Sequence, residues 1–170
     1  RFNSAPAVGE PFAWLCVSAG TPGTWVNVGG VPLVATTAVG NVGTGEDNLQ
    51  TVTLPASMML VTGSTVRITA WGTKANNADT KTLKLHFGSA TILTHALGTG
   101  AAGSWKITAD VVSTGTDAQD YNAFLIGTDT DAEIGTATQD DGAAIIIKCT
   151  GEATSNNDIV QEGLIVELLR

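Results

Sequence analysis

The sequence predicts an all-β fold: an antiparallel, jelly-roll-like β-sandwich preceded by a short β-hairpin segment. Three observations lead to this prediction. No stretch of 11 or more residues places apolar side chains at the spacing of a helix. Thr and Val, which favour strands, are frequent throughout the chain. Gly, Asn and Asp recur every few residues, so they divide the chain into short elements of the length found in sandwiches and barrels.

The clearest strand signal is an alternation of polar and apolar residues, the pattern of a strand with one face buried and the other in water. It occurs in three runs, residues 65–71, 81–87 and 105–111. A polar loop, residues 74–80, separates the first two runs and is rich in residues that favour turns. We therefore expect residues 65–71 and 81–87 to form a hairpin.

Further strands are predicted in residues 89–95, 119–127, 143–150 and 158–169. Residues 158–169 carry apolar groups on both faces, which indicates a central strand or one covered by a neighbouring subunit. About eight strands after residue 50 agree with a jelly roll. The one helical signal is residues 54–60, where a Pro followed by good helix formers predicts a single short turn.

A small hairpin is predicted near the start of the chain. Residues 20–24 form a Pro-Gly turn between two apolar runs, residues 14–17 and 25–28. A two-stranded hairpin cannot bury both of its faces alone. We expect it to pack on the main domain, on an upstream segment or on symmetry mates.

The chain divides into two parts at about residue 45. Residues 36–48 are rich in Gly, Thr and Val and are predicted to be a linker. The prediction is therefore a connector or stem segment with linker, residues 1–45, and a sandwich domain, residues 46–170. Because the chain begins at Arg1 without Met, we expect this start to be a processing boundary within a longer protein.

The composition points to a surface with few charges. Hydrophobic residues make up 43% of the chain and charged residues only 14%, against the roughly 25% that is typical of soluble proteins. We expect Thr, Ser, Asn and Gly, or another copy of the protein, to cover the apolar groups.

The charge pattern disfavours two classes of partner. The net charge is −8 and the basic residues are isolated, whereas nucleic acids and anionic membranes attract clustered cations. The longest apolar runs, such as residues 143–147, are far shorter than the ~20 residues that span a bilayer. We expect neither nucleic-acid binding nor membrane insertion.

The two cysteines, Cys16 and Cys149, lie in apolar segments far apart in the sequence. Disulfide frameworks of small proteins use more cysteines at closer spacing. We expect two buried free thiols, with a bridge between them as the alternative.

Two parts of the sequence resemble a known group of proteins. Residues 11–25, PFAWLCVSAGTPGTW, resemble the segment that follows the shaft or β-helix body in tailspike and tail fibre proteins of tailed bacteriophages, with Ala13 where Gly is usual. Residues 63–72 (GSTVRITAWG), residues 81–88 (KTLKLHFG) and the closing residues 166–169 (VELL) resemble the C-terminal jelly-roll domain of such fibres and of some head fibres.

The resemblance implies a homotrimeric virion domain that caps or trimerises a fibre and contacts a host surface glycan. It also implies a location on the virion, assembled in the bacterial cytoplasm and then extracellular. Two hypotheses stay open. One is a receptor-binding module for host attachment, and the other is a structural protein, a capsid decoration, head fibre or trimerisation cap without receptor binding.

One group of acidic residues is a weak candidate for a metal site. Five carboxylates, those of Asp129, Asp131, Glu133, Asp140 and Asp141, lie within one stretch, and Ca²⁺ prefers clustered oxygen ligands. The spacing lacks the central Gly and terminal Glu of an EF-hand loop. We expect solvated loop acids and no cofactor, with a Ca²⁺ site as the alternative.

The best candidate for a glycan contact is an aromatic residue beside a polar loop. Trp71 precedes Gly72, and its ring offers the flat apolar platform that sugars use. Asn76, Asn77 and Asp79 follow in the next loop and could supply polar contacts.

No residue pattern indicates an enzyme. His86 and His95 lie in strand-like segments without metal-ligand spacing, and no nucleophile motif occurs. The local acid pairs that could serve glycoside hydrolysis lie on the linker and on the last strand; they are Glu46 with Asp47, and Glu162 with Glu167. We expect both histidines to be structural, with His86 exposed, and no catalytic residue.

Overall fold

The computed structural model describes residues 13–18, 24–28 and 32–169, with side chains from residue 32 onward. Within them every regular element is a strand, and all paired strands are antiparallel. Strands β1 (Ala13–Ser18) and β2 (Thr24–Val28) form the predicted hairpin. No helix in the described part has the length and apolarity that a membrane crossing requires.

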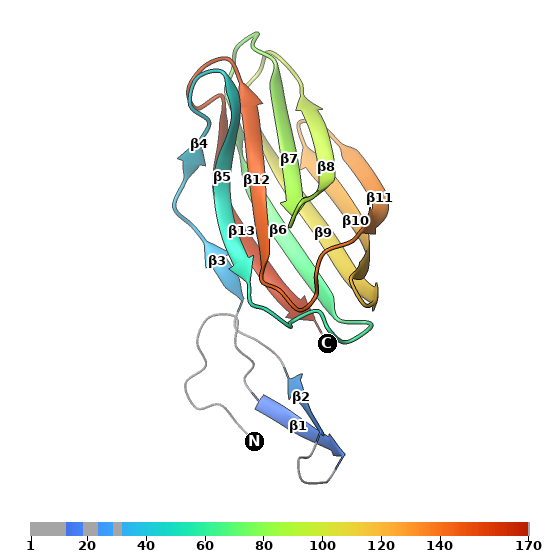
Figure 1. Ribbon diagram of the computed structural model, residues 1–170. Coiled ribbons are helices and arrows are strands. Elements are labelled where there is room, and N and C mark those ends of the chain that lie inside the picture. Colours follow the sequence, from blue (N-terminus) through green and yellow to red (C-terminus); the bar gives the residue numbers. More distant parts are fainter. Residues whose placement is uncertain (1–12, 19–23, 29–31, 170) are drawn as a thin grey trace.

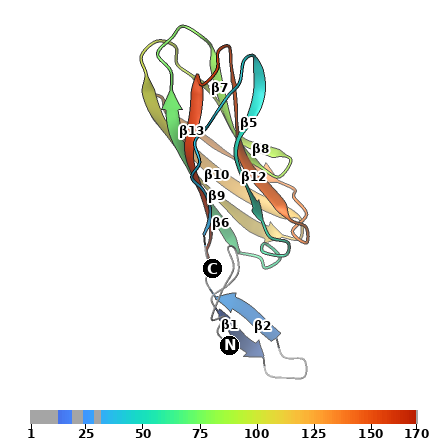
Figure 2. The same cartoon turned by 90° about the vertical axis from the view of Figure 1, so that its left-hand side faces the viewer.

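Two sheets face each other and form a jelly-roll-like sandwich, as predicted (Figures 1 and 2). The order of the larger sheet is β11-β10-β9-β6-β13-β3, with β4 also on β13, and the order of the smaller sheet is β5-β12-β7-β8. The seven strands of the larger sheet are β3 (Leu33–Ala35), β4 (Val39–Gly40), β6 (Thr65–Lys74), β9 (Gly103–Gly115), β10 (Ala118–Gly127), β11 (Asp131–Ala137) and β13 (Ile159–Leu169). The four strands of the smaller sheet are β5 (Gly45–Leu54), β7 (Lys81–Phe87), β8 (Ala90–Leu97) and β12 (Ile145–Ala153).

The core lies between the sheets, and the alternation in the sequence decides which residues enter it. In β6, Val66, Ile68 and Ala70 are fully buried, while their sequence neighbours face outward. Strand β7 contributes Leu83 and Leu85 from the opposite sheet in the same way. The other large apolar side chains of the core are Phe87, Ile92, Leu93, Trp105, Ile107, Leu125 and Ile147.

Side chains close the two open sides of the sandwich. On one side, edge strands β8 and β11 meet where Glu133 accepts a hydrogen bond from the Thr94 amide at 2.9 Å and His95 Nδ1 lies 2.8 Å from an oxygen of Asp131. On the other side, the Gln50 amide of β5 donates to the side-chain oxygen of Gln161 in β13 at 2.9 Å. These contacts protect edge strands that would otherwise be free to pair with other chains.

The predicted hairpin of residues 65–71 and 81–87 is wrong. Strand β6 pairs with β13 and β9, whereas β7 pairs with β12 and β8 in the other sheet. Both strands have one apolar face, and these faces pack against each other across the core. The polar loop between them therefore crosses from one sheet to the other.

Two other predicted segments differ from the structure. Residues 54–60 contain turns and bends but no helix, and Ser57 has a positive φ of 67° that a helix does not permit. Residues 36–48, predicted as a linker, contain β4 and the start of β5. Strands β3 and β4 both pair with β13, so residues 33–40 belong to the larger sheet. The division of the chain into a stem segment before residue 45 and a sandwich domain after it otherwise stays a prediction.

The prediction for the last strand is confirmed. Strand β13 has β6 on one side and β3 and β4 on the other, so it lies inside the sheet. Its inner face contributes Leu164 and Val166 to the core. The apolar residues of its outer face have a different role, described below.

Cys149 is a free, fully buried thiol, as expected. Burial raises the pKa of this thiol to about 12, which a hydrogen bond with Gln161 only partly offsets. The thiol is therefore an inert part of the core. The side chain of Cys16 lies outside the described residues.

Candidate functional site

The outer face of the seven-stranded sheet carries large apolar side chains that stay exposed among the residues that the structure describes. Ile134 is 81% exposed, Ile126 64%, Val34 51% and Phe124 44%. Ile126 and Phe124 alternate along β10 with the buried Ala123 and Leu125, so they face away from the core.

The strand register joins these residues into continuous rows. One row crosses six strands through Val34, Ile165, Thr69, Thr108, Phe124 and Ala132. A second row contains Gly163, Trp71, Lys106 and Ile126. Ile134 lies opposite Asn122, diagonally next to Phe124. We call the set Val34, Trp71, Phe124, Ile126, Ile134 and Ile165 the outer apolar surface.

The charges on this face are few and partly neutralised. Arg67 donates two hydrogen bonds to the carboxylate of Asp110, at 2.8 and 3.0 Å, across the β6–β9 pair. Between the apolar residues lie the threonines of the central strands and, in the second row, the exposed Lys106. Contiguous apolar patches on this scale mark protein interfaces more often than free surface.

Trp71 is part of the outer apolar surface and does not lie at the end of the sandwich that carries the loop after β6. It stands three residues before the end of β6, and its half-buried ring covers Gly163 of β13. A Cβ atom at Gly163 would lie 2.0 Å from Cζ2 of Trp71, so only glycine leaves room for the ring. The sequence signal for this contact is a glycine inside a strand, which marks a close approach.

Replacing Gly163 by Ala is expected to destabilise the fold by roughly 1–3 kcal/mol, because the methyl group displaces the Trp71 ring. Thermal unfolding at fixed protein concentration measures the effect. The double variant Gly163→Ala/Trp71→Ala should recover part of the loss. Equal costs in the presence and absence of Trp71 would contradict this account.

The outer face of the four-stranded sheet is polar. Glu46 accepts hydrogen bonds from Lys84 at 2.5 Å and from the Thr150 hydroxyl at 2.6 Å. His86 lies 2.9 Å from the same hydroxyl, and its side chain is 13% exposed. His86 is therefore on the outer face, as the alternation predicts, but the expectation that it is exposed is wrong. Its hydrogen-bonded neighbours cover it.

Two groups of this face titrate away from their usual pKa values. Hydrogen bonds from Lys84 and Thr150 lower the pKa of Glu46. Burial, and next the charge of Lys148, lower the pKa of His86 below its ordinary value of 6.5. A lowered folded-state pKa means that the unfolded chain binds more protons. Both groups therefore stabilise the fold at neutral pH and cease to do so on acidification.

The variant His86→Asn is expected to show a weaker fall of the melting temperature between pH 7 and pH 5 than the wild type. In this window the unfolded wild-type chain takes up a proton at His86 while the folded chain resists it. Melting curves at several pH values measure the difference. Parallel pH profiles for the two proteins would argue against the assignment.

The residues predicted for a glycan contact do not meet at one place. Asn76 is exposed in the loop after β6, while Asn77 and Asp79 belong to a network that holds this loop. Lys81 donates to the side-chain oxygen of Asn77 at 2.5 Å and to the backbone oxygen of Asp79 at 2.9 Å. The Ser155 hydroxyl donates to the Asp79 carboxylate at 2.9 Å.

The same end of the sandwich has a polar cavity of about 220 Å³. It is lined by Gly45, Ala153, Glu152 and four threonines: Thr44, Thr80, Thr82 and Thr154. Hydroxyl groups and one carboxylate suit a polar ligand. Trp71 faces a different surface, so this cavity lacks the aromatic platform that the sequence suggested.

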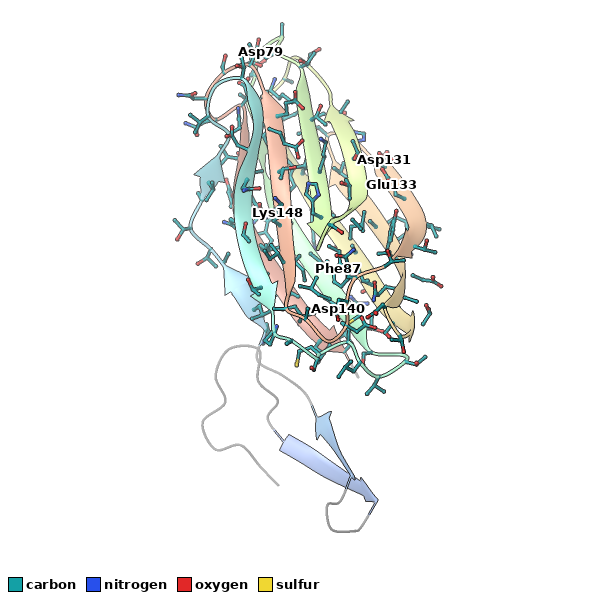
Figure 3. All side chains as sticks on the ribbon, in the orientation of Figure 1. Asp79, Phe87, Asp131, Glu133, Asp140 and Lys148 are labelled. Carbon is teal, nitrogen blue, oxygen red and sulfur yellow. The ribbon has the colours of Figure 1, made fainter. Side chains whose placement is uncertain are left out.

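The candidate metal ligands are separated in the structure. Asp129 accepts from the Gly98 amide and lies 3.5 Å from Lys74, while Asp131 contacts His95. Asp140 accepts from the Gly142 amide, and the buried Asp141 accepts from Gln119. Asp131 and Glu133 lie side by side on β11, whereas Asp140 lies apart from them, toward the other end of the sandwich (Figure 3). Within the described residues no group of three or more potential ligands could hold a metal ion.

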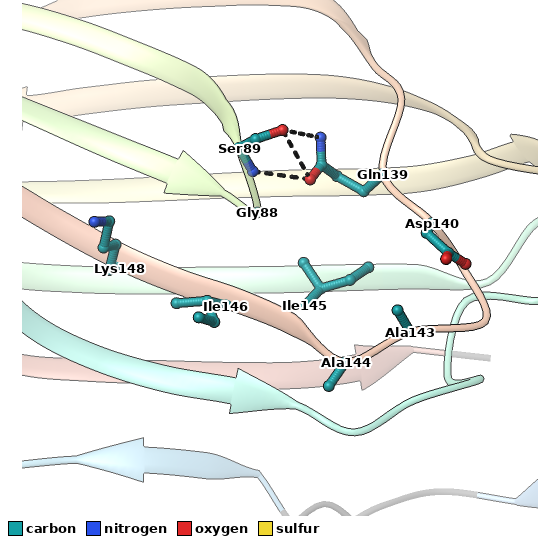
Figure 4. A pocket seen from close by; sticks show the side chains of 9 residues that line it. All are labelled: Gly88, Ser89, Gln139, Asp140, Ala143, Ala144, Ile145, Ile146 and Lys148. Atoms are coloured by element: carbon teal, nitrogen blue, oxygen red, sulfur yellow. Dashed lines mark hydrogen bonds between the residues drawn. The ribbon is translucent and has the colours of Figure 1, made fainter.

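A larger, more apolar cavity of about 380 Å³ lies beside β12 (Figure 4). Gln139 forms one wall and accepts hydrogen bonds from the Ser89 amide and hydroxyl, at 2.8 and 3.3 Å. Ile145, Ile146 and Lys148 form the other wall. Its ionisable lining residues are Asp140 and Lys148, which do not make a catalytic arrangement.

Comparison with known proteins gives only distant matches. The sequence matches no protein-family model and no curated protein. A solved structure of the infectious bursal disease virus Gx strain is 9% identical, with a TM-score of 0.36, and the alignment covers 86% of this chain and 35% of that one. The VP2 subviral particle of the same virus is 11% identical, with a TM-score of 0.37 and coverage of 95% and 38%. This chain thus spans little more than a third of those chains. TM-scores this low assign neither family nor function.

Proposed function

We propose that this chain is a virion structural domain that assembles with copies of itself through the outer apolar surface. The observation that carries the proposal is the exposure of Phe124, Ile126 and Ile134 on one continuous sheet face. The other sheet has a polar outer face held by Glu46, Lys84 and His86. One outer face therefore exposes large apolar side chains and the other exposes charged and polar ones, which is the contrast between the centre of an interface and a free surface.

A second copy is the occupant that the residues favour. The central strands present threonines between the apolar residues, and Arg67 is paired with Asp110 within the chain. Lys106, beside Ile126, is the cation of this face without an ion pair among the described residues, and its long side chain can extend to the rim of a contact. Two copies can then bury their isoleucines and Phe124 against each other while the charge stays in water.

The resemblance to fibre domains of tailed bacteriophages extends this proposal to a homotrimer on a virion. We infer that three copies arrange their seven-stranded sheets around one axis and cap a tail fibre, tailspike or head fibre. Single-particle imaging of the purified chain tests this arrangement. We expect three copies with β10 and β11 at the contact. Separate single copies, or contact through the four-stranded sheet, would contradict it.

Host attachment is a second candidate function, favoured by the polar cavity at the loop end. The four threonine hydroxyls and Glu152 suit the hydroxyl groups of a bacterial surface polysaccharide, and three weak sites on one trimer would add through avidity. Binding to a panel of such polysaccharides tests it. The variant Thr82→Ala/Glu152→Ala should lose binding and Trp71→Ala should keep it. No binding by the wild type would oppose the attachment role.

The same proposal includes no catalytic activity and no resident cofactor. It is supported by ion pairs such as Arg67 with Asp110 and Asp131 with His95, in which the charged groups hold the fold. Ca²⁺ at the separated aspartates is not part of the proposal.

A further inference from the structure

Three polar side chains meet at the end of the sandwich that carries the loop after β6, in an arrangement that permits a reaction between them. Lys81 is 1% exposed and Asp158 is 1% exposed, and the side chain of Asn77 lies between them. Lys81 Nζ donates to Asn77 Oδ1 at 2.5 Å. Asn77 Nδ2 donates to Asp158 Oδ1 at 2.5 Å. Hydrogen bonds thus join an amine, a carboxamide and a carboxylate in a site where the two charged side chains are buried.

We propose that Lys81 and Asn77 become joined by an isopeptide bond, formed by the folded chain itself with Asp158 as the proton carrier. The bond joins Nζ of Lys81 to Cγ of Asn77 and releases ammonia. The proposal is independent of assembly, because all three residues belong to one chain.

The distance between the reacting groups permits attack. The Asn77 C=O bond is about 1.23 Å long, so an amine 2.5 Å from Oδ1 lies at most about 3.7 Å from Cγ. Productive attack starts from about 3–3.5 Å. A small rotation of either side chain is therefore sufficient. Conversion of a buried ammonium to a neutral amide also removes a charge that is costly to keep away from water.

A hydrogen-bond donor stands ready for the oxygen of the intermediate. The backbone amide of Asp79 donates to Asn77 Oδ1 at 3.2 Å. When Lys81 attacks Cγ, negative charge develops on this oxygen, and a fixed N–H group stabilises it. The donor belongs to the tight loop between Asn77 and Lys81, so folding of the loop places it.

Asp158 is held by both of its oxygens. Oδ1 accepts from Asn77 Nδ2, and Oδ2 accepts from the Ser155 amide at 3.1 Å. Burial raises the pKa of Asp158, but the hydrogen bonds from Asn77 and Ser155 outweigh this and hold it below the usual value. The carboxylate is therefore the resident form, and it can accept a proton.

The reaction balances without any further reactant. As the Lys81 side chain turns from Oδ1 toward Cγ, Asp158 takes a proton from its ammonium, and the electron pair freed on Nζ forms a bond to Asn77 Cγ. In the tetrahedral intermediate Asp158 gives this proton to Nδ2 and takes a second proton from Nζ. The Cγ–Nδ2 bond then breaks and ammonia leaves. The products are one secondary amide and one ammonia, which takes the second proton from Asp158 and leaves as ammonium, so Asp158 is again a carboxylate.

Mass spectrometry of the intact, denatured wild-type chain tests the proposal. We expect a mass lower than that of the sequence by one ammonia, roughly 17 Da. Trypsin normally cleaves after lysine, and cleavage after Lys74 and Lys84 yields residues 75–84. This peptide should carry the same mass loss and remain uncut after Lys81, because the amine is blocked. A full sequence mass together with complete cleavage after Lys81 would overturn the proposal.

Three variants give the matched comparison. Lys81→Met and Asp158→Asn should both retain the full mass, the first because the amine is absent and the second because the proton carrier is absent. Lys106→Met, a change on the exposed outer face, should still show the loss of ammonia. Mass loss in Asp158→Asn equal to that of the wild type would refute the role of Asp158. The mass of the wild-type chain tests the presence of the bond even if a variant does not fold.

Discussion

Replacing Ile126 and Ile134 together by Asp is expected to convert the proposed trimer into folded single chains. Both side chains are more than 60% exposed in the isolated chain, at 64% and 81%, so the fold loses little. In an assembly each buried isoleucine contributes about 1.5–3 kcal/mol, and each new carboxylate would have to leave water. The combined effect on the association constant is on the order of a thousandfold or more. Light scattering and circular dichroism measure mass and fold.

The control is an isoleucine of similar exposure on the other sheet. Ile146 of β12 is 49% exposed on the polar outer face, beside Lys148. Ile146→Asp should therefore leave the oligomer intact. Dissociation by Ile146→Asp, or a double variant Ile126→Asp/Ile134→Asp that keeps its assembly, would place the interface elsewhere.

The second large effect is expected from Trp105→Ala, which should destabilise the fold by about 3–5 kcal/mol. Trp105 is 2% exposed in β9 and packs against Gly72, where a Cβ atom would lie 2.6 Å from its ring. Its Nε1 donates to the backbone oxygen of Thr73 at 3.2 Å. Alanine leaves a cavity and removes this hydrogen bond. Denaturant unfolding at fixed protein concentration measures the loss.

Trp71→Ala provides the matched tryptophan. This side chain is only half-buried and lies on the outer face over Gly163. Its removal should cost much less folding free energy than that of Trp105. Equal losses for the two variants would mean that Trp105 does not anchor the core.

The sequence predicted the strands best where one face is buried and the other wet. The alternation of residues 65–71 and 105–111 appears in β6 and β9, although both strands run further than the pattern indicates. Strands β3, β4, β5 and β11 were not predicted. Strand β11 is an edge strand whose outer Ile134 is exposed, so it lacks the alternation that marks a buried face.

The partners of the strands could not be predicted from local patterns. Strands β6 and β7 could pair in one sheet as a hairpin, or they could lie in opposite sheets with their apolar faces toward the core. Both arrangements require the same alternation of polar and apolar residues, so the sequence does not distinguish them. The residues of the glycan prediction lie apart because the predicted strand of residues 65–71 is too short. Strand β6 continues to Lys74, so Trp71 lies within the sheet and not beside the loop of Asn76, Asn77 and Asp79.

The lysine of the loop-end network did have a sequence signal. In residues 81–87, Lys81 has the same phase as Leu83, Leu85 and Phe87, so the alternation alone places it on the buried face. A buried lysine requires a partner. That its partners are Asn77 and Asp158 follows only from the fold, since Asp158 lies 77 residues later in the chain.

Static light scattering on the purified, folded chain at micromolar concentration tests the central proposal most directly. Coverage of the outer apolar surface by copies of the chain predicts a mass three times the 17.3 kDa of the single chain, unchanged on moderate dilution. A stable, soluble species of 17.3 kDa, with Phe124, Ile126 and Ile134 left in water, would contradict it.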